Sequence, residues 1–226
     1  MKRFWTEVGV DAREVRLDGR PVRTPGRLPL VLPTDALAEA VAGEWRSVDA
    51  AIDPRAMPLT GLANAAIDRI APDPAPFAEG LARYGESDLL CYRADDPPEL
   101  VARQAALWNP PLAWARGRYD VGFEVTTGIV HRAQPSATIA RLGEAVGALG
   151  AWRLAGLSPV VTITGSLVLA LALAERAMTV DAVWAAAQAD EDWQAERWGE
   201  DALAAEARDA RRRELGAAAA FLAALD

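Results

Sequence analysis

Residues 157–174 read LSPVVTITGSLVLALALA and contain no charged side chain. Such a segment must leave water, either inside a protein core or inside a membrane. Its 18 residues lie at the lower limit for a membrane-spanning helix, and Pro159, Gly165 and four hydroxyl side chains interrupt its apolar character. We therefore predict a buried core helix at this position and no stable membrane insertion.

The composition of the chain fits a folded domain with such a core. Of its 226 residues, 51% are hydrophobic and 25% are charged, a balance typical of globular proteins. The formal net charge of -8 repels a phosphate backbone, so we expect no nucleic-acid partner. The N-terminal MKRFWTEVGV lacks the long apolar run of a signal peptide, and Cys91 is the single cysteine, which favours the reducing bacterial cytoplasm.

The first third of the chain combines a strand-like part with a helix. Residues 8–31 alternate apolar and polar side chains around Asp18-Gly19, a dipeptide typical of a hairpin turn. Thr34 then stands where it can cap a helix, whose apolar positions recur at helical spacing and place Trp45 toward the core in a structural role. These patterns predict a small antiparallel sheet followed by a helix.

The rest of the chain is predominantly helical in pattern. Prolines in residues 97–119 are expected to interrupt or kink one of these helices, and residues 119–130 suggest a short strand. We predict an α+β fold: a small antiparallel β-rich N-terminal domain ending in a helix (residues 1–50) and a larger, mainly α-helical domain (residues 51–226).

Motifs for catalysis, metals or nucleotides are absent from the sequence. His131 is the only histidine and has no placed nucleophile beside it, and Cys91 has no histidine nearby to activate it. No glycine-rich phosphate loop occurs, and the acidic clusters at residues 95–96 and 190–192 lack the spacing of a calcium loop. We therefore expect no catalytic residue, metal or cofactor, an inert buried Cys91 and acidic clusters that are solvated surface.

Residues 189–201, ADEDWQAERWGED, combine six carboxylates with two tryptophans. If residues 180–205 form one helix, Trp184 and Trp198 share an apolar stripe with Glu191. On another side of that helix Asp192, Glu196 and Glu200 align at i, i+4 and i+8, which costs roughly 0.2–0.5 kcal/mol per neighbouring pair of like charges. Such an arrangement requires compensation or a use, although Gly199 is a residue at which the helix can end or bend.

Two interpretations of this segment remain open. In the structural one, Trp184 and Trp198 are core residues, Glu191 pairs with an arginine of another helix, and the acidic face is solvated. In the functional one, Trp193 and the surrounding carboxylates form a contact patch for a basic partner, because an aromatic anchor with a charged rim is typical of a binding hot spot.

Several segments of the chain resemble, in one order, the family of assembly chaperones for the alpha subunit of the F-type ATP synthase, which occurs in mitochondria and alphaproteobacteria. The segments are RFW at residues 3–5, LDGRPVRTP at 17–25, LPTDALAEAVAGEW at 32–45, MPLTGLANAAID at 57–68, DLLCYRADDPPELVARQAALWNPPLAWA at 88–115 and EDWQAERWG at 191–199. The resemblance thus extends over nearly the whole chain.

The resemblance implies a molecular chaperone rather than an enzyme. Members of the family bind the unassembled alpha subunit, prevent its aggregation and are displaced by the beta subunit; they act in the bacterial cytoplasm or the mitochondrial matrix. Their fold is a β-rich N-terminal part with a helical C-terminal part, and Trp45 corresponds to a helix tryptophan with a structural role. Carried over by position, the client-binding residues are Glu191, Asp192, Trp193, Trp198, Gly199 and Asp201. After Gly199 the chain continues EDALAAEARD and departs from the eukaryotic pattern of a Glu-Trp and a His-Asp pair.

Two other functional classes compete with the chaperone hypothesis. An enzyme of unknown reaction would use the carboxylates of Glu191 and Asp192 as a general acid/base pair, which requires a pocket and a raised carboxylate pKa. A peripheral membrane adaptor would need a basic amphipathic helix, for which the sequence offers only the short RDARRREL segment.

Overall fold

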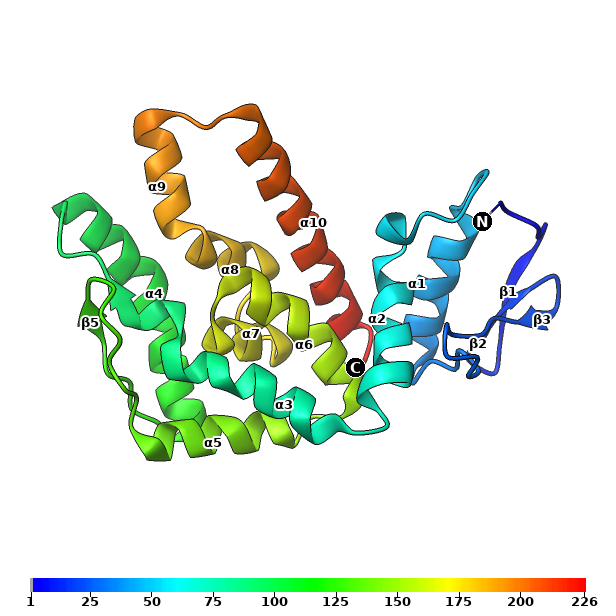
Figure 1. Cartoon of the computed structure of the whole chain (residues 1–226), viewed down its shortest axis with the longest axis horizontal. Coiled ribbons are helices and arrows are strands. Elements are labelled where there is room, and N and C mark those ends of the chain that lie inside the picture. The colour runs from blue at the N-terminus through cyan, green and yellow to red at the C-terminus, as the bar shows by residue number, and fades with distance from the viewer. Residues whose placement is uncertain (1) are drawn as a thin grey trace.

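A computed structural model describes residues 2–226 of the chain. The α+β fold predicted above is confirmed: a small antiparallel sheet is followed by a helical body (Figure 1). The strands are β1 (Val8–Asp11), β2 (Glu14–Leu17), β3 (Arg20–Pro21), β4 (Tyr92–Arg93) and β5 (Thr126–Thr127). The α-helices are α1 (Asp35–Arg46), α2 (Pro58–Ala65), α3 (Pro74–Ala82), α4 (Pro98–Tyr119), α5 (Ser136–Gly147), α6 (Ala151–Thr164), α7 (Leu167–Ala174), α8 (Val180–Ala187), α9 (Ala189–Trp198) and α10 (Ala202–Ala223). Short turns of other helix types are η1 (Pro54–Ala56), the π-turn η2 (Ala66–Ile70), η3 (Arg83–Ser87) and η4 (Leu89–Cys91).

The N-terminal sheet has the strand order β1-β2-β3 and contains two tight hairpins. The second is the predicted one: Asp18 and Gly19 form its turn, and Leu17 pairs with Arg20. The first turns at Ala12 and Arg13, which both adopt positive φ angles, as a two-residue turn matched to the strand twist requires. Neither residue is a glycine, and the sequence pattern therefore did not indicate this turn.

Helix α1 covers the sheet and begins at the predicted cap. The hydroxyl oxygen of Thr34 accepts a hydrogen bond from the Leu37 N–H at 3.1 Å. Trp45 lies on the inward face of α1 with 9% of its surface exposed, and its ring meets that of Trp5 edge to face at 5.3 Å between centroids. At the other end of the chain, the Ala224 carbonyl accepts a hydrogen bond from the Thr34 hydroxyl, so the end of α10 lies against the start of α1.

Three carboxylates fasten the N-terminal segments to one another and to α2 and η2. Each accepts at least one hydrogen bond from a backbone N–H group of a segment distant in sequence, and two also accept a hydrogen bond from a threonine hydroxyl. The donors are Thr6 and Glu7 N–H to Asp18 (3.0 and 2.8 Å), Leu59 and Thr60 N–H and the Thr60 hydroxyl to Glu44 (2.7, 2.8 and 2.7 Å), and Gly26 N–H and the Thr24 hydroxyl to Asp68 (2.8 and 2.6 Å). Carboxylates that accept such bonds satisfy backbone groups that turns leave without a partner.

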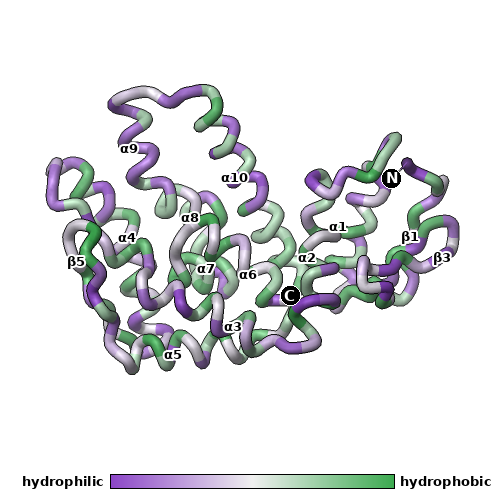
Figure 2. The backbone as a smooth tube through the Cα atoms, viewed as in Figure 1, coloured by the Kyte–Doolittle hydropathy of each residue, from purple (hydrophilic) through white to green (hydrophobic). Residues whose placement is uncertain are grey.

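Helices α6 and α7 lie at the centre of the helical body and are its most hydrophobic part (Figure 2). The predicted burial of residues 157–174 is confirmed, but the single helix is wrong. Gly165 adopts a positive φ of 65° and ends α6, and Ser166 caps α7 by accepting a hydrogen bond from the Leu169 N–H at 3.0 Å. Within residues 2–226, no helix is long and apolar enough to cross a membrane.

Asp88 is buried beside the first turn of α7. Its carboxylate accepts hydrogen bonds from the N–H groups of Leu90 (3.1 Å) and Val168 (3.0 Å). Burial raises the pKa of Asp88 to about 6, although these hydrogen bonds act in the opposite direction. Burial also raises the pKa of the neighbouring Cys91 thiol to about 12, which agrees with the predicted inert cysteine.

One local expectation in the helical part, the interruption of a helix by prolines, is corrected, and another is confirmed. Helix α4 continues through Pro110 and Pro111, even though an internal proline costs about 3 kcal/mol. Trp108, one turn earlier, is buried and donates a hydrogen bond to the Ala186 carbonyl at 2.7 Å, so packing against α8 holds this part of α4 in place. The short strand expected in residues 119–130 is confirmed as β5, which pairs in parallel with β4. The division of the chain at residue 50 stays a prediction.

Candidate functional site

The acidic and aromatic segment lies on two helices, and the predicted single helix over residues 180–205 is wrong. Helix α8 ends at Ala187, and Gln188, with φ and ψ of −103° and 14°, turns the chain before α9 begins. Helix α9 ends at Gly199, which has a φ of 81°. Asp201 then caps α10, since one carboxylate oxygen accepts hydrogen bonds from the N–H groups of Leu203 and Ala204 at 2.8 and 3.0 Å.

These breaks change the predicted direction of one tryptophan. Trp184 on α8 is buried with 5% of its surface exposed, as predicted. Trp198 is 73% exposed and lies at the end of α9. The predicted apolar stripe does not continue from Trp184 to Trp198, because the turn at Gln188 resets the helical phase between them.

Helix α9 and the first half of α10 form two arms that extend from the body and are joined at their outer ends (Figure 1). We call residues 189–213 the arch. Arg208 on α10 connects the arms, because its guanidinium forms an ion pair with Asp192 of α9 and lies 3.6 Å from the carboxylate of Glu200 in the turn. All three side chains are about 30% exposed, so this bridge is partly shielded from solvent.

Helix α9 is also attached to α4. The Arg103 guanidinium donates a hydrogen bond to the Glu196 carboxylate at 2.7 Å, and the Gln104 amide donates one to Asp190 at 2.7 Å. Arg103 holds the pKa of the Glu196 carboxyl below its ordinary value. The arch is therefore held by polar contacts on both sides of α9.

The acidic residues of the arch fall into two groups. Asp192, Glu196 and Glu200 each face an arginine of another helix, which compensates the repulsion expected from their spacing. Glu191 is exposed and has no ion pair or side-chain hydrogen bond with any residue in 2–226. The structural interpretation expected Glu191 to pair with an arginine of another helix, and within these residues no such pair forms. Glu191 is thus available for contacts with another molecule.

An apolar surface lies at the outer end of the arch. The rings of Trp193 and Trp198 meet edge to face at 5.6 Å between centroids, and the Arg197 guanidinium lies 4.7 Å from the centre of the Trp193 ring. Leu203, at the start of α10, is 77% exposed. Large apolar side chains with this exposure, beside exposed carboxylates, are the composition of a protein-binding surface.

The structure brings all six sequence-predicted site residues into the arch but gives them different local environments. Asp201 caps α10, Gly199 provides the turn, and Asp192 binds Arg208. Sequence reasoning missed Leu203 and Arg208. The signal for Leu203 was available: a glycine followed two residues later by an aspartate is typical of one helix ending and the next beginning. Arg208 could be assigned only from the three-dimensional contact.

The arch does not assemble the acid/base pair of the enzyme hypothesis. Asp192 is held by Arg208, and Glu191 faces solvent, so the two carboxyls do not share the pocket that the enzyme hypothesis requires. Across residues 2–226 no group of three or more His, Cys, Asp or Glu side chains is arranged to hold a metal ion.

Comparison with known proteins identifies the class as chaperones. The family model described as ATP12 chaperone protein matches residues 2–116. The structure is similar to the crystal structure of Atp12 from Paracoccus denitrificans, with 39% identity, a TM-score of 0.93 and coverage of 100% of this chain and 98% of that chain. It is also similar to a candidate chaperone from Agrobacterium tumefaciens, with 42% identity, a TM-score of 0.94 and coverage of 100% and 86%.

The chain belongs to the ATP12 chaperone family, which confirms the resemblance found in the sequence. This membership supports a chaperone role in ATP synthase assembly. The family model ends before the arch, whereas both structural matches include it.

Proposed function

We propose that this chain binds the unassembled alpha subunit of the F-type ATP synthase, prevents its aggregation and leaves when the beta subunit covers the same surface. It performs this role in the bacterial cytoplasm, without a cofactor and without catalysing a reaction. Subunits of a ring expose apolar surfaces before assembly, and such surfaces self-associate. A binder that covers one of them must form an interface weak enough to be displaced.

The exposed apolar end of the arch is the observation that carries this proposal. Trp198 and Leu203 lie at its outer end, on arms that ion pairs hold together, so little conformational entropy is lost when a partner binds. We assign client contacts to the predicted set, with Trp198 and Trp193 as aromatic anchors and Glu191 at the rim. The remaining members, Asp192, Gly199 and Asp201, position these side chains.

The negative charge of the arch orients the client as it approaches. Glu191 and the exposed Asp201 increase the negative potential around the tryptophans, in a chain with a net charge of -8. Such a potential accelerates encounter with a basic patch on the client more than it increases affinity. Glu191→Lys should therefore slow association and reduce its dependence on ionic strength.

The test is size-exclusion chromatography with light scattering on mixtures of the chain and isolated alpha subunit. We expect a stoichiometric complex, less aggregation of the alpha subunit, and dissociation when the beta subunit is added. Trp198→Ala should weaken the complex at least tenfold, and Trp193→Ala and Glu191→Lys should weaken it less. No complex with the wild-type chain would refute the proposal.

A matched control separates the arch from apolar surface in general. Ile129 is 96% exposed and lies outside the arch, next to β5. Ile129→Ala removes exposed apolar surface as Trp198→Ala does, and it should leave client binding unchanged. Circular dichroism and melting curves of each variant test for unfolding; a large fall in melting temperature for Trp193→Ala or Glu191→Lys would favour the structural interpretation.

A further inference from the structure

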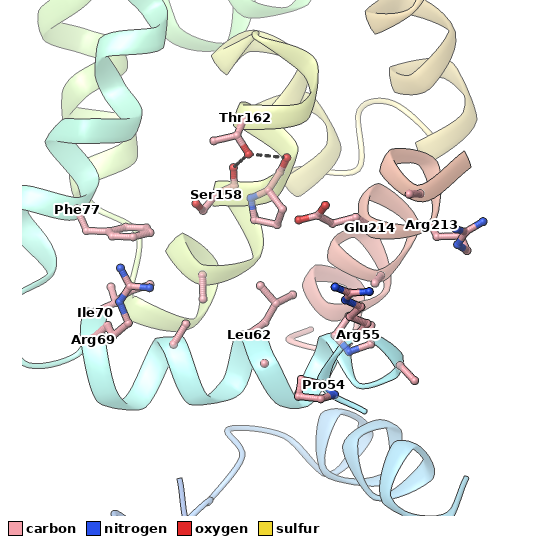
Figure 3. A pocket seen from close by; sticks show the side chains of 18 of the residues that line it. Pro54, Arg55, Leu62, Arg69, Ile70, Phe77, Ser158, Thr162, Arg213 and Glu214 are labelled. Atoms are coloured by element: carbon pink, nitrogen blue, oxygen red, sulfur yellow. Dashed lines mark hydrogen bonds between the residues drawn. The ribbon is translucent and has the colours of Figure 1, made fainter. Parts of the chain in front are cut away.

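A groove of about 1060 Å³ lies between α2 and α10, and none of Trp193, Trp198 and Leu203 lines it (Figure 3). Helices α2 and η2 form one wall, α10 forms the other, and α6 forms the floor. Figure 3 shows Leu62, Ser158 and Glu214 facing this space from three different helices. The groove is therefore built from elements of the N-terminal and C-terminal halves of the chain.

The walls present small side chains at helical spacing. Gly61 and Ala65 on α2 are four residues apart, and Ala210 and Ala217 on α10 are seven residues apart. Side chains three and four residues apart share one face of a helix. Small residues on facing walls allow a helix, about 10 Å across with its side chains, to approach the backbone closely.

Unpaired cations mark the α2 wall. Arg55, just before α2, and Arg69, just after it, both line the groove and are exposed. Neither guanidinium has an ion pair or a side-chain hydrogen bond with any residue between 2 and 226. The α10 wall opposite carries Glu206, Arg213 and Glu214, so the α2 wall is the cationic side of the groove and fits the carboxylates of an occupant.

The groove is continuous with the exposed end of the arch. Leu203 precedes Ala210 by seven residues on α10, so the two side chains lie on the same face of the helix. A partner that covers Leu203 therefore meets Ala210 and the rest of the groove along one helix face.

We propose that this groove holds an amphipathic helical segment of the client, with its small apolar side chains between Gly61 and Ala210 and its carboxylates toward Arg55 and Arg69. This inference rests on the proposed function, because it assigns a second contact with the same client. The mode is that of a helix lying in a groove, in which apolar positions supply affinity and charges fix the direction. The arch and the groove then recognise different features of the client: a basic patch at Glu191 and an acidic helix at the α2 wall.

A groove-filling variant tests the proposal. Gly61 is exposed, and a Cβ atom added to it meets nothing within 4 Å, so Gly61→Trp fills the groove without a clash at the point of attachment. We expect alpha-subunit binding at least tenfold weaker than for the wild-type chain. The control is Gly117→Trp, at an exposed glycine of α4 that also has open space around its Cβ position and lies outside the groove.

A charge-reversal variant tests the chemistry of the occupant independently of shape. Arg55→Glu combined with Arg69→Glu should weaken binding at least fivefold at low ionic strength and less at high ionic strength. Arg83→Glu is the control, since Arg83 is an exposed residue of η3 that lies outside both the groove and the arch. If both groove variants bind the alpha subunit like the wild-type chain, the groove assignment is wrong and the proposed function stands.

Fluorescein-labelled peptides tiling the alpha subunit separate the remaining outcomes by fluorescence anisotropy. We expect one acidic, amphipathic peptide to bind the wild-type chain and to lose binding with Gly61→Trp. Absence of any such peptide would overturn the groove proposal. A wild-type chain that binds neither peptides nor alpha subunit would refute both proposals. A concentration-dependent dimer abolished by Gly61→Trp would show that the occupant is a second copy of the chain instead.

Discussion

The N-terminal unit, by which we mean residues 2–68, and the arch both contain carboxylates in segments that resemble the family, but the two regions use them differently. In the N-terminal unit, Asp18, Glu44 and Asp68 accept hydrogen bonds from other segments of the same chain. In the arch, Glu191 remains without such a partner, and the neighbouring Trp198 is 73% exposed. A motif residue that satisfies backbone groups of its own chain contributes to the fold, whereas one that faces solvent beside an aromatic ring is available for a partner.

The family model and the structural matches cover different extents of the chain, and their coverage follows the same division. The family model matches residues 2–116, which include every internal fastening carboxylate named above and end before the arch. The family model thus rests on the N-terminal half of the chain, whereas the client contacts that we propose lie in the arch. Substitutions in the two regions should accordingly separate stability from client binding.

The largest expected effect on stability is that of Glu44→Ala. This substitution removes the acceptor of three hydrogen bonds, two from the backbone of α2 and one from the Thr60 hydroxyl. Leaving these partly buried donors without an acceptor should lower the free energy of unfolding by about 3 kcal/mol. Chemical denaturation measures the change. Glu39→Ala is the control on the same helix, because Glu39 forms only a solvent-exposed ion pair with Arg46 and should cost less than about 0.5 kcal/mol. Equal losses for the two variants would contradict the fastening role of Glu44.

The next largest effect concerns the pH dependence of stability. Because the pKa of Asp88 is raised from 3.8 to about 6 by burial, the folded chain binds this proton more tightly than the unfolded chain. Its contribution to stability is therefore fully present below about pH 4 and is lost as the pH rises through 6, by at most about 3 kcal/mol. Asp88→Asn should remove this slope, as measured by the free energy of unfolding between pH 4 and 7.

The pH dependence of stability contributed by Glu196, in the arch, has the opposite sign to that contributed by Asp88. Its pKa is lowered by Arg103, so its contribution is present above the unfolded value of 4.5 and is lost as the pH falls through the folded pKa. Glu196→Gln should flatten only that acidic limb of the curve. If Asp88→Asn and Glu196→Gln changed the same limb, the assignment of opposite titrations to core and arch would be wrong.

Local signals were sufficient to predict part of the fold. Asp18-Gly19 and Thr34 act within a few residues of the chain, and the hairpin and the helix start that they predicted are confirmed. Contacts such as that between Glu44 and Thr60 join segments 16 residues apart, and no pattern within either segment specifies the partner. In the arch, helical periodicity alone places Trp198 on an apolar stripe that runs across Gln188 and Gly199. The chain turns at both residues, so the stripe is interrupted. The composition of the site was thus predictable, but its exposure and its support by Arg208 were not.

Gly199→Ala should lower the stability of the whole chain less than Glu44→Ala does, and its effect should be confined mainly to the arch. At a φ of 81° and a ψ of 170° the backbone lies in a region that is essentially restricted to glycine, so an alanine there costs about 1–3 kcal/mol. The arch can relieve this strain by shifting the turn, which should displace Trp198 and weaken client binding more than it lowers the melting temperature. Gly216→Ala is the matched control on α10: its Cβ position is open and helical, so it should raise stability by about 0.5–1 kcal/mol. Identical effects of the two substitutions would show that the turn conformation is unimportant.

The smallest expected effect on global stability is that of Arg208→Gln, which removes the bridge between the arms of the arch. The partners Asp192 and Glu200 are about 30% exposed and stay solvated, so the free energy of unfolding should fall by less than about 1 kcal/mol. Amide hydrogen exchange should nevertheless increase in residues 189–201, while α6 and α7 stay protected, because local opening has its own free energy. If client binding then falls although the core is unchanged, pre-organisation of the arch contributes to affinity. If exchange rises but binding is unaffected, the client orders the arch by itself, and the contrast with the internally fastened N-terminal unit extends from structure to dynamics.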